Sequence, residues 1–207
     1  MQSPSMPPAS FLFASPVVDY DHAAVATLAT SLSDFTPAAT AKRCFDWVRD
    51  EIQHSLDYHR NVVACAASDV LAAGTGLCLA KSHLLVALLR AHAIPAGFCY
   101  QRLLFDERDS LFCTHGLVAL WLQDYGWYRC DARGNRPGIW CEFTPGRENL
   151  AFSEHRSGEH LYPYVWAEPW PELVRRLRAL ESIAQYCADP IDLTPPACAD
   201  DQVIRMA

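Results

Sequence analysis

The chain has no apolar run of the about 20 residues that a helix needs to cross a bilayer. Its first 16 residues contain no Lys or Arg, and their only apolar patch is Phe11, Leu12 and Phe13. This stretch does not have the form of a secretory signal. We therefore expect no membrane partner, and we expect residues 1–16 to be a loose, Pro-rich lead-in.

Blocks of basic residues are also absent. The sequence has 17 Lys and Arg against 24 Asp and Glu, which gives a formal net charge of −7. A mildly acidic chain without a basic stretch offers no electrostatic attraction for nucleic acid or for an anionic membrane. We expect no nucleic-acid partner.

No Cys-x-x-Cys pair occurs, although there are 9 cysteines. This spacing argues against a zinc cage, and we predict no metal and no cofactor. An odd number of cysteines without a secretion signal indicates a reducing compartment, so a cytoplasmic location is expected. Eight of them are expected to pack as buried free thiols; the full set is Cys44, Cys65, Cys78, Cys99, Cys113, Cys130, Cys141, Cys187 and Cys198.

There is no internal repeat, and 51% of the 207 residues are hydrophobic, enough to fill a real core. We expect one domain over residues 17–189, followed by a C-terminal tail at 190–207 that Pro190, Pro195 and Pro196 keep from being helical.

The first half of the chain predicts helices. Residues 36–54 have a capping Thr36, a Pro at the first helical position and apolar residues at helical spacing. A short helix is expected at 68–71, stopped by Gly74. Residues 78–92 form a nearly continuous apolar run of helix formers that Pro95 ends, which is typical of a buried helix.

The second half predicts strands at 97–105, 115–122 and 126–132, with a turn at 123–126 that joins the last two as an antiparallel hairpin. Residues 139–167 are expected to be irregular or β and rich in aromatics, and 171–186 to be an amphipathic helix. Helices followed by an antiparallel sheet and a closing helix define the α+β class.

Cys78 differs from the other cysteines because it follows the turn Gly74-Thr75-Gly76 and opens the buried helix. Free backbone N–H groups and the helix dipole at such a position stabilise negative charge. A thiol there is expected to have a lowered pKa and to be a nucleophile, and the same N–H groups can receive an oxyanion.

A thiolate needs a proton partner. His115 begins one predicted strand and Asp131 ends the next, so a hairpin with its turn near Gly126 places both at its open end. The carboxylate can then accept from one imidazole nitrogen and direct the other toward the sulfur.

The segment GTGLCLAKSHLLVALLRAHAIPAGFCYQRL resembles the core of transglutaminase-like proteins. In that family a Gly-x-Cys opens a helix that leads to Leu-Arg-Ala and Ile-Pro-Ala, its His precedes a strand, and its Asp follows a Gly-Trp. The similarity covers roughly residues 40–135, and the matching positions here are Gly76, Cys78, Arg90, Ile94, Pro95, His115, Gly126, Trp127 and Asp131.

This resemblance implies a papain-like or transglutaminase-like core with Cys78, His115 and Asp131 as a catalytic triad. It implies acyl transfer from an amide of a peptide or protein substrate through a thioester, with hydrolysis slightly favoured over transfer to an amine. Gln53 and His54 are candidates for a second oxyanion donor, because related thiol enzymes place a polar donor upstream of the cysteine. The chain departs from the family's His-Ala-Trp or His-Ser-Trp, since it reads His115-Gly116-Leu117.

Simpler interpretations stay open. Each triad residue taken alone has a structural explanation: packing for Cys78, a strand end for His115 and a turn cap for Asp131. Lys81 and Ser82 are interpreted as surface or supporting groups, His83 as noncatalytic, and His54 and His59 as solvated. The rival function is a noncatalytic peptide- or protein-binding member of the same fold.

Overall fold

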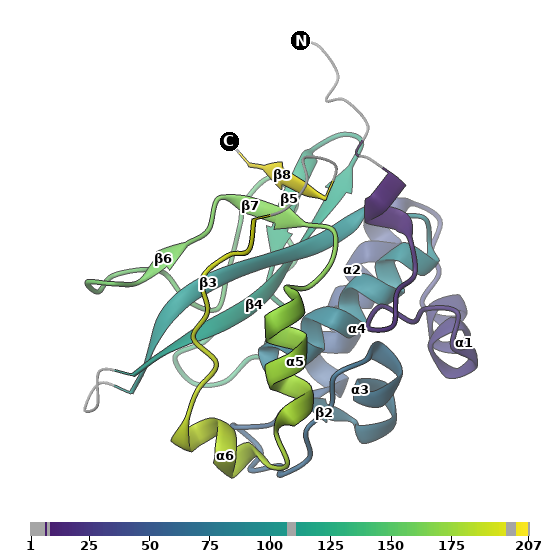
Figure 1. Ribbon diagram of the computed structural model, residues 1–207. Helices are drawn as coiled ribbons and strands as arrows, with labels where there is room; N and C mark the ends of the chain where they lie inside the picture. Colours follow the sequence, from purple (N-terminus) through teal and green to yellow (C-terminus); the bar gives the residue numbers. More distant parts are fainter. Residues whose placement is uncertain (1–6, 8, 107–110, 198–201, 207) are drawn as a thin grey trace.

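The computed structural model describes residues 7, 9–106, 111–197 and 202–206. In these residues one 3₁₀ turn and four α-helices precede the main sheet, and two more α-helices come before its last strand (Figure 1). The helices are the 3₁₀ turn η1 (Ala9–Leu12), α1 (Ala23–Ser31), α2 (Pro37–Glu51), α3 (Ala67–Ala73), α4 (Cys78–Ala91), α5 (Pro171–Ala179) and α6 (Ile183–Ala188). The strands are β1 (Gln53–His54), β2 (Thr75–Gly76), β3 (Ala96–Asp106), β4 (Leu111–Leu122), β5 (Gly126–Cys130), β6 (His160–Leu161), β7 (Tyr164–Trp166) and β8 (Val203–Arg205).

The large sheet has the order β5-β4-β3-β7-β8, with β6 also paired to β3, and every pairing in it is antiparallel. The predicted hairpin is present, because Val118 of β4 pairs with Cys130 of β5. One register sets up the site: Gln101 of β3 lies opposite His115 of β4. The predicted α+β class is confirmed.

Helix α4 is the buried helix that the apolar run predicts. All of its side chains from Cys78 to Arg90 are buried, and it packs against β3 and β4. Arg90 is held by backbone carbonyls, donating to Ala96 O (2.9 and 3.0 Å) and to Phe13 O (2.7 Å). This buried guanidinium therefore ties α4 to the start of β3 and to the N-terminal segment.

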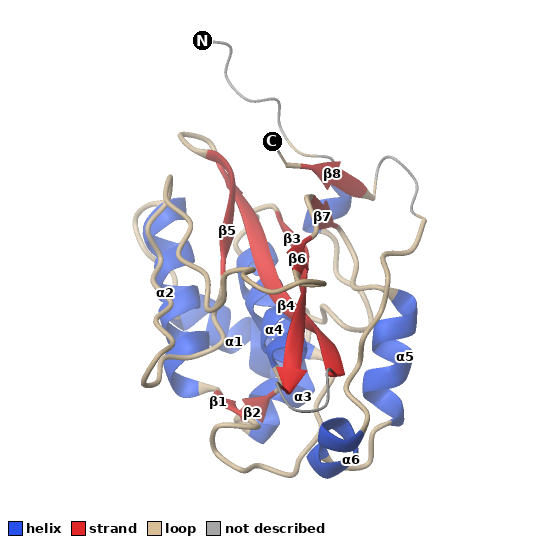
Figure 2. Cartoon of the chain, turned by 90° about the vertical axis from the view of Figure 1, so that its left-hand side faces the viewer, coloured by secondary structure: helices blue, strands red, loops and turns tan. Residues whose placement is uncertain are grey.

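The predicted helix 36–54 is wrong at its C-terminal end. Helix α2 ends at Glu51, and Gln53–His54 instead forms a two-residue parallel pairing with Thr75–Gly76. The backbone N–H of Gln53 donates to Gly74 O and that of Ser55 to Gly76 O, both at 3.0 Å. A tertiary partner far along the chain thus overrides the local helical pattern. Figure 2 shows β1 and β2 below one end of the long strands β3 and β4.

The predicted single helix over 171–186 is also wrong, because it is broken between α5 and α6. Leu180 is extended (ψ 128°), and Ser182 then caps a new helix by accepting the N–H of Gln185 at 3.2 Å. Ser182 followed by Gln185 is a capping pattern that was present in the sequence. The break turns α6 so that Tyr186 faces the cavity described below.

The described part of the N-terminal lead-in is more firmly packed than predicted, and the described part of the tail also packs against the core. In the lead-in, Phe11 is fully buried, and a Cβ added to Gly97 of β3 would lie 2.8 Å from its ring. In the tail, Ile191 is buried and β8 pairs with β7. The described part of the tail is non-helical, as predicted, but it completes the sheet. Cys198 lies outside the described residues.

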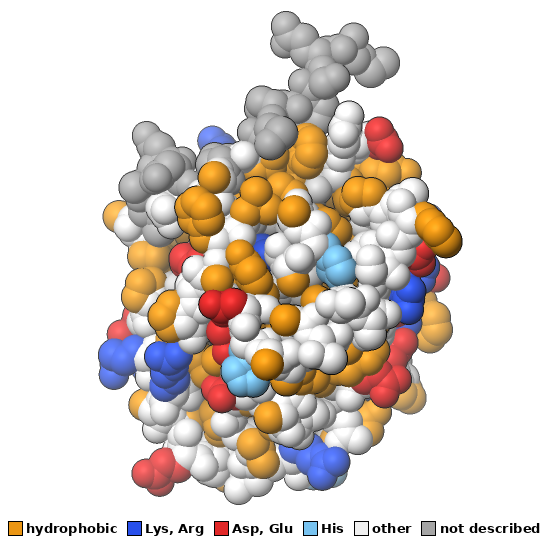
Figure 3. Space-filling model, turned by 90° about the vertical axis from the view of Figure 1, so that its right-hand side faces the viewer, with side chains coloured by type: hydrophobic (Ala, Val, Ile, Leu, Met, Phe, Trp, Pro, Cys, Tyr) orange, Lys and Arg blue, Asp and Glu red, His pale blue; other side chains and the backbone are white. Residues whose placement is uncertain are grey.

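The aromatic residues of the segment before α5 cover the core. Trp166 and Trp170 pack edge to face at 5.2 Å, and Tyr162 and Tyr100 pack against both. On the face that carries α1 and α3, Lys and Arg side chains do not gather into one patch (Figure 3). Among the described residues, no helix combines the length and apolarity needed to cross a membrane.

Candidate active site

Cys78 is the first residue of α4, and the turn before it fixes its position. Gly74, with a left-handed φ of 62°, ends α3 and leads into β2. The first hydrogen bond of α4 runs from Lys81 N to Leu77 O at 2.9 Å. The N–H groups of Cys78 and Leu79 precede it and have no acceptor within the helix, so partial positive charge gathers around the thiol.

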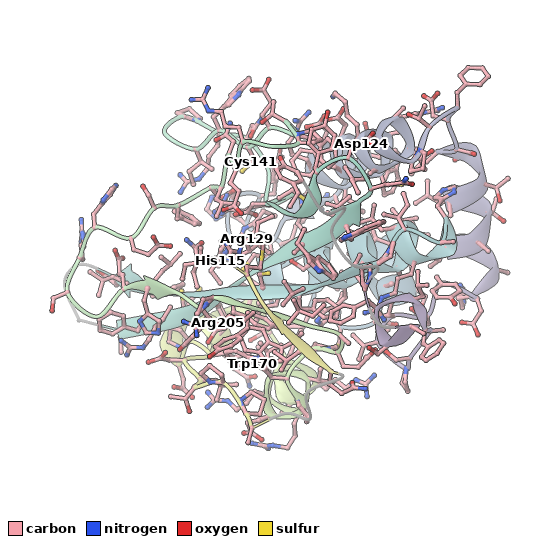
Figure 4. The ribbon with its side chains drawn as sticks, turned by 90° about the horizontal axis from the view of Figure 1, so that it is seen from above. His115, Asp124, Arg129, Cys141, Trp170 and Arg205 are labelled. Carbon is pink, nitrogen blue, oxygen red and sulfur yellow. The ribbon has the colours of Figure 1, made fainter. Side chains whose placement is uncertain are left out.

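His115 and Asp131 meet beside this thiol, as the hairpin spacing predicts. His115 Nε2 lies 2.8 Å from Asp131 Oδ2, and both side chains are buried. Asp131 also accepts the backbone N–H of Arg133 on Oδ1 and that of Ala151 on Oδ2, each at 3.1 Å. The carboxylate therefore caps the turn and holds the imidazole at once. Seen from above, His115 lies in the middle of the molecule, with Trp170 off to one side by α5 (Figure 4).

The three groups shift one another's pKa values. Burial alone would raise the pKa of Cys78, but the charge of His115 and hydrogen bonding to it, assisted by His54, lower that pKa well below its usual value. Burial alone would lower the pKa of His115, yet Asp131 and Cys78 raise it to about 10. The pKa of Asp131 is lowered, because His115 outweighs the effect of burial. The arrangement favours a thiolate beside an imidazolium at neutral pH.

The other described cysteines behave differently. Burial raises the pKa of six of them, namely Cys44, Cys65, Cys99, Cys113, Cys130 and Cys141. Cys187 is exposed, so the prediction that it packs in the core is wrong. Within the described residues, Cys78 is thus the thiol whose surroundings favour ionisation.

Of the two candidate oxyanion donors, His54 lies at the cavity with Cys78 and Gln53 does not. His54 is 4% exposed, so its predicted solvation is wrong, and it lines the same cavity as Cys78, close enough to help lower the pKa of the thiol. Burial lowers its pKa, and nearby Arg133 lowers it further, which keeps the imidazole neutral. Gln53 instead accepts from Arg60 Nε at 2.6 Å and does not line the cavity with Cys78. The pairing of His54 with Gly76, two residues before the cysteine, is what brings this second histidine to the thiol.

The loop that carries Phe152 covers the side chain of His115. The ring of Phe152 meets His115 edge to face at 5.1 Å, and the guanidinium of Arg133 lies over the same ring at 5.5 Å. Gln101 holds the loop in place by donating to Phe152 O at 3.1 Å and to Glu154 Oε1 at 2.6 Å. Since Gln101 is the cross-strand neighbour of His115, the sheet itself positions this cover.

These groups border a cavity of about 250 Å³ that opens onto Cys78. Its wall is apolar on the side of the β3–β4 hairpin and α6, where Phe105 and Tyr186 stack edge to face at 5.6 Å. The lining residues are His54, Leu56, Leu77, Cys78, Leu103, Leu104, Phe105, Cys113, His115, Arg133, Arg136, Phe152, Ser153, Glu159 and Tyr186. A cavity of this kind can receive the side chain of a substrate next to the thiol.

The departure at Gly116 has a steric reason. A Cβ at this position would lie 3.0 Å from both Cα and Cδ2 of Leu79. The glycine therefore allows β4 to approach the first turn of α4 closely, which brings His115 to Cys78. In this chain the glycine after His115 is a packing requirement of the contact between β4 and α4.

Two residues of α4 lie deeper than predicted. Lys81 is 1% exposed, donates to the carbonyls of Ile52 and Arg49 where α2 ends, and has its pKa lowered to about 7 by burial. Ser82 is buried and donates to Cys78 O at 2.9 Å. Of the two predicted alternatives, a surface position is wrong for both residues, whereas a supporting position fits Ser82, which bonds the backbone of Cys78. The sequence does not predict that this lysine is buried, because its burial depends on how α2 packs against α4.

The histidine within α4 has a structural role. His83 is buried, its Nδ1 lies 2.7 Å from Cys65 O, and burial lowers its pKa to about 4. It does not line the cavity. No group of three or more His, Cys, Asp or Glu suited to hold a metal ion occurs within the part of the chain that the structure describes.

The comparisons with known proteins agree with the fold. The model of the transglutaminase-like superfamily matches residues 16–132, more than half of the chain, and the protein belongs to this superfamily. Two solved structures are similar: a candidate cysteine protease from Cytophaga hutchinsonii (22% identity, TM-score 0.47) and the periplasmic domain of TgpA from Pseudomonas aeruginosa (18% identity, TM-score 0.43). The similarity covers 59% and 62% of this chain but only 40% and 48% of theirs. No curated protein matches.

Proposed function

We propose that the protein is a thiol-dependent amide hydrolase or acyl transferase in which Cys78, His115 and Asp131 act as the catalytic triad. The observation that carries the proposal is the buried contact of His115 with Asp131 beside a thiol whose pKa is lowered. The free cysteines of the described chain are in keeping with a reducing compartment such as the cytoplasm.

The proposed reaction has two steps. The Cys78 thiolate attacks the amide carbonyl carbon, and His115 gives its proton to the leaving amine as the C–N bond breaks, which leaves a thioester. Water or an amine then attacks the thioester and loses a proton to His115, and the C–S bond breaks, which releases the acid or the new amide and restores the Cys78 thiolate. The carboxylate of Asp131 keeps the imidazole oriented and stabilises its positive charge.

Hydrolysis is the favoured outcome. A carboxylate with free oxygens at the cavity would attract an amine acceptor, which carries a positive charge in solution at neutral pH. Among the described residues that line the cavity, the one carboxylate is Glu159. Its oxygens already accept the backbone N–H groups of Leu104, His155 and Arg156 at 3.0–3.1 Å.

Incubating the protein with glutamine peptides, with and without a primary amine, tests the function. In both reactions we expect hydrolysis of an amide to an acid product, which mass spectrometry detects. A new amide formed with the added amine would identify a transferase instead. Saturable peptide binding without any product, at every peptide tried, would support the noncatalytic binding protein.

His54 is proposed as the side-chain donor to the oxyanion, together with the backbone N–H of Cys78. Its neutral imidazole lies against the thiol, and its Nδ1 is buried without a hydrogen-bond partner among the described residues. His54→Ala is expected to lower kcat by about 10²–10³-fold with little change in KM, as for other oxyanion donors. His54→Asn, which keeps a donor, should recover part of this loss.

Steady-state kinetics of both variants check this role, with His59→Ala as the matched control, since His59 is exposed five positions along the same loop. A loss for His54→Ala that appears in KM alone would assign His54 to substrate binding and refute the oxyanion role.

A further inference from the structure

The active-site cavity continues onto the surface along residues 134–140. His54 lines both the cavity and a hollow of about 120 Å³ beside Tyr58 and Gly134. Arg136 lines both the cavity and a shallow hollow of about 500 Å³ formed by residues 135–140. The shared residues make these three spaces neighbours, and we call the surface from Arg136 to Trp140 the rim groove.

The rim groove is built on a fixed turn. Arg136 and Ile139 exchange backbone hydrogen bonds at 2.9 and 3.1 Å, and Gly138 takes the left-handed φ of 84° that follows a proline in such turns. Ile139 and Cys141 are buried, and Asn135 Oδ1 accepts the N–H of Cys141 at 2.6 Å. The turn is therefore anchored on both sides of Trp140.

This anchoring holds an aromatic side chain outward. Trp140 is 65% exposed between two buried neighbours, and Tyr58, which borders the adjoining hollow, is 57% exposed. Neither ring contributes to the core. Exposed aromatics on a rigid surface next to an active site are typical of binding residues, because they bury much area at little cost in conformational entropy.

The charge at the cavity end of the rim groove is positive. Arg133 binds Asp57 through two contacts of 2.6 and 3.0 Å and is buried, so its pairing is complete. Arg136 reaches the same carboxylate only through Nε at 3.3 Å, and its side chain is 48% exposed. One carboxylate thus faces two guanidinium groups, and the half-exposed Arg136 keeps further donors at the edge of the cavity that Cys78 also lines.

We propose that the rim groove binds a polypeptide segment next to the reacting amide, with an acidic side chain against Arg136 and an apolar or aromatic side chain against Trp140. This inference rests on the proposed function and narrows its substrate to polypeptides. The aromatic anchor would supply affinity, and the guanidinium would select the charge of the neighbouring residue.

Two peptide pools test the groove: in one the reacting amide is flanked by Glu and Phe, and in the other by Lys and Ser at the same positions. We expect the wild-type protein to prefer the first pool in kcat/KM by about tenfold. Arg136→Glu should reverse the charge preference, and Trp140→Ser should raise KM for the first pool. Arg175→Gln and Phe35→Ser are the controls, since both side chains are highly exposed outside the groove.

The outcomes separate the two proposals. An initial burst of nitrophenol from p-nitrophenyl acetate reports acylation of Cys78 in the wild-type protein. A burst with equal kcat/KM for both pools would overturn the groove and leave the proposed function standing, whereas the absence of burst and turnover would overturn both. If sedimentation shows a dimer that Trp140→Ser dissociates, the groove is an interface between copies of this chain, and the proposal fails.

Discussion

Replacing Cys78 by serine is expected to lower amide turnover by roughly 10³- to 10⁶-fold, with the fold intact. The hydroxyl of serine has nearly the shape of the thiol, but it is not ionised by the histidines that lower the pKa of Cys78. Circular dichroism and the midpoint of urea unfolding should match those of the wild-type protein. A variant that keeps more than a tenth of the turnover would end the nucleophile proposal.

Alkylation supplies an independent measurement. At about pH 6, where a thiol of ordinary pKa is almost wholly protonated, iodoacetamide should modify Cys78 before the other buried cysteines. The exposed Cys187 would compete, so the experiment needs a Cys187→Ser background. Cys113 is the internal control, because it lines the same cavity and burial raises its pKa to about 12. Equal labelling of Cys113 and Cys78 would contradict the ionised thiol.

The geometry of Cys78, His115 and Asp131 could be predicted because its determinants are local. A glycine turn, an apolar helix and a hairpin with one short turn place three residues without knowledge of the rest of the fold. The observed 2.8 Å contact between His115 and Asp131 is the result of that hairpin register. Family resemblance points to the same three positions, and so the two lines of inference support each other.

The surroundings of the three residues could not be predicted in this way. His54 reaches the thiol only because β1 pairs with β2. No pattern in the sequence around His54 predicts that it pairs with Gly76. Lys81 is buried because the carbonyls at the end of α2 lie above it. Such positions depend on how elements distant in sequence are packed, which periodicity does not encode.

The break between α5 and α6 has a local signal in the sequence. Ser182 and Gln185 form a local capping pattern within a stretch whose apolar stripe favours one continuous helix. The capping pattern starts a new helix here, although the apolar stripe favours a continuous one. As a consequence, Tyr186 of α6 lines the cavity. The Pro-rich lead-in gave the opposite error, since composition suggested looseness where Phe11 is buried.

Asp131→Asn is expected to lower kcat by roughly 10²- to 10⁴-fold and to change its pH dependence. Turnover needs Cys78 ionised and His115 protonated, so it should rise with pH through the lowered pKa of Cys78 and fall through the pKa of His115 at about 10. Asp131 is a principal cause of that raised pKa. Without its charge, the alkaline limb of the profile should move to lower pH, because a less stabilised imidazolium loses its proton sooner.

The control for this shift is Asp189→Asn, the same chemical change at an exposed carboxylate that pairs with Arg176 outside the cavity. It should leave both limbs of the profile in place. Asp131→Asn also weakens the acceptors for Arg133 N and Ala151 N, which could lower activity through the covering loop alone. Loop disturbance without a charge effect would reduce kcat equally at all pH values. A profile that drops but keeps its alkaline limb would therefore show that Asp131 positions the loop rather than sustaining the charge on His115.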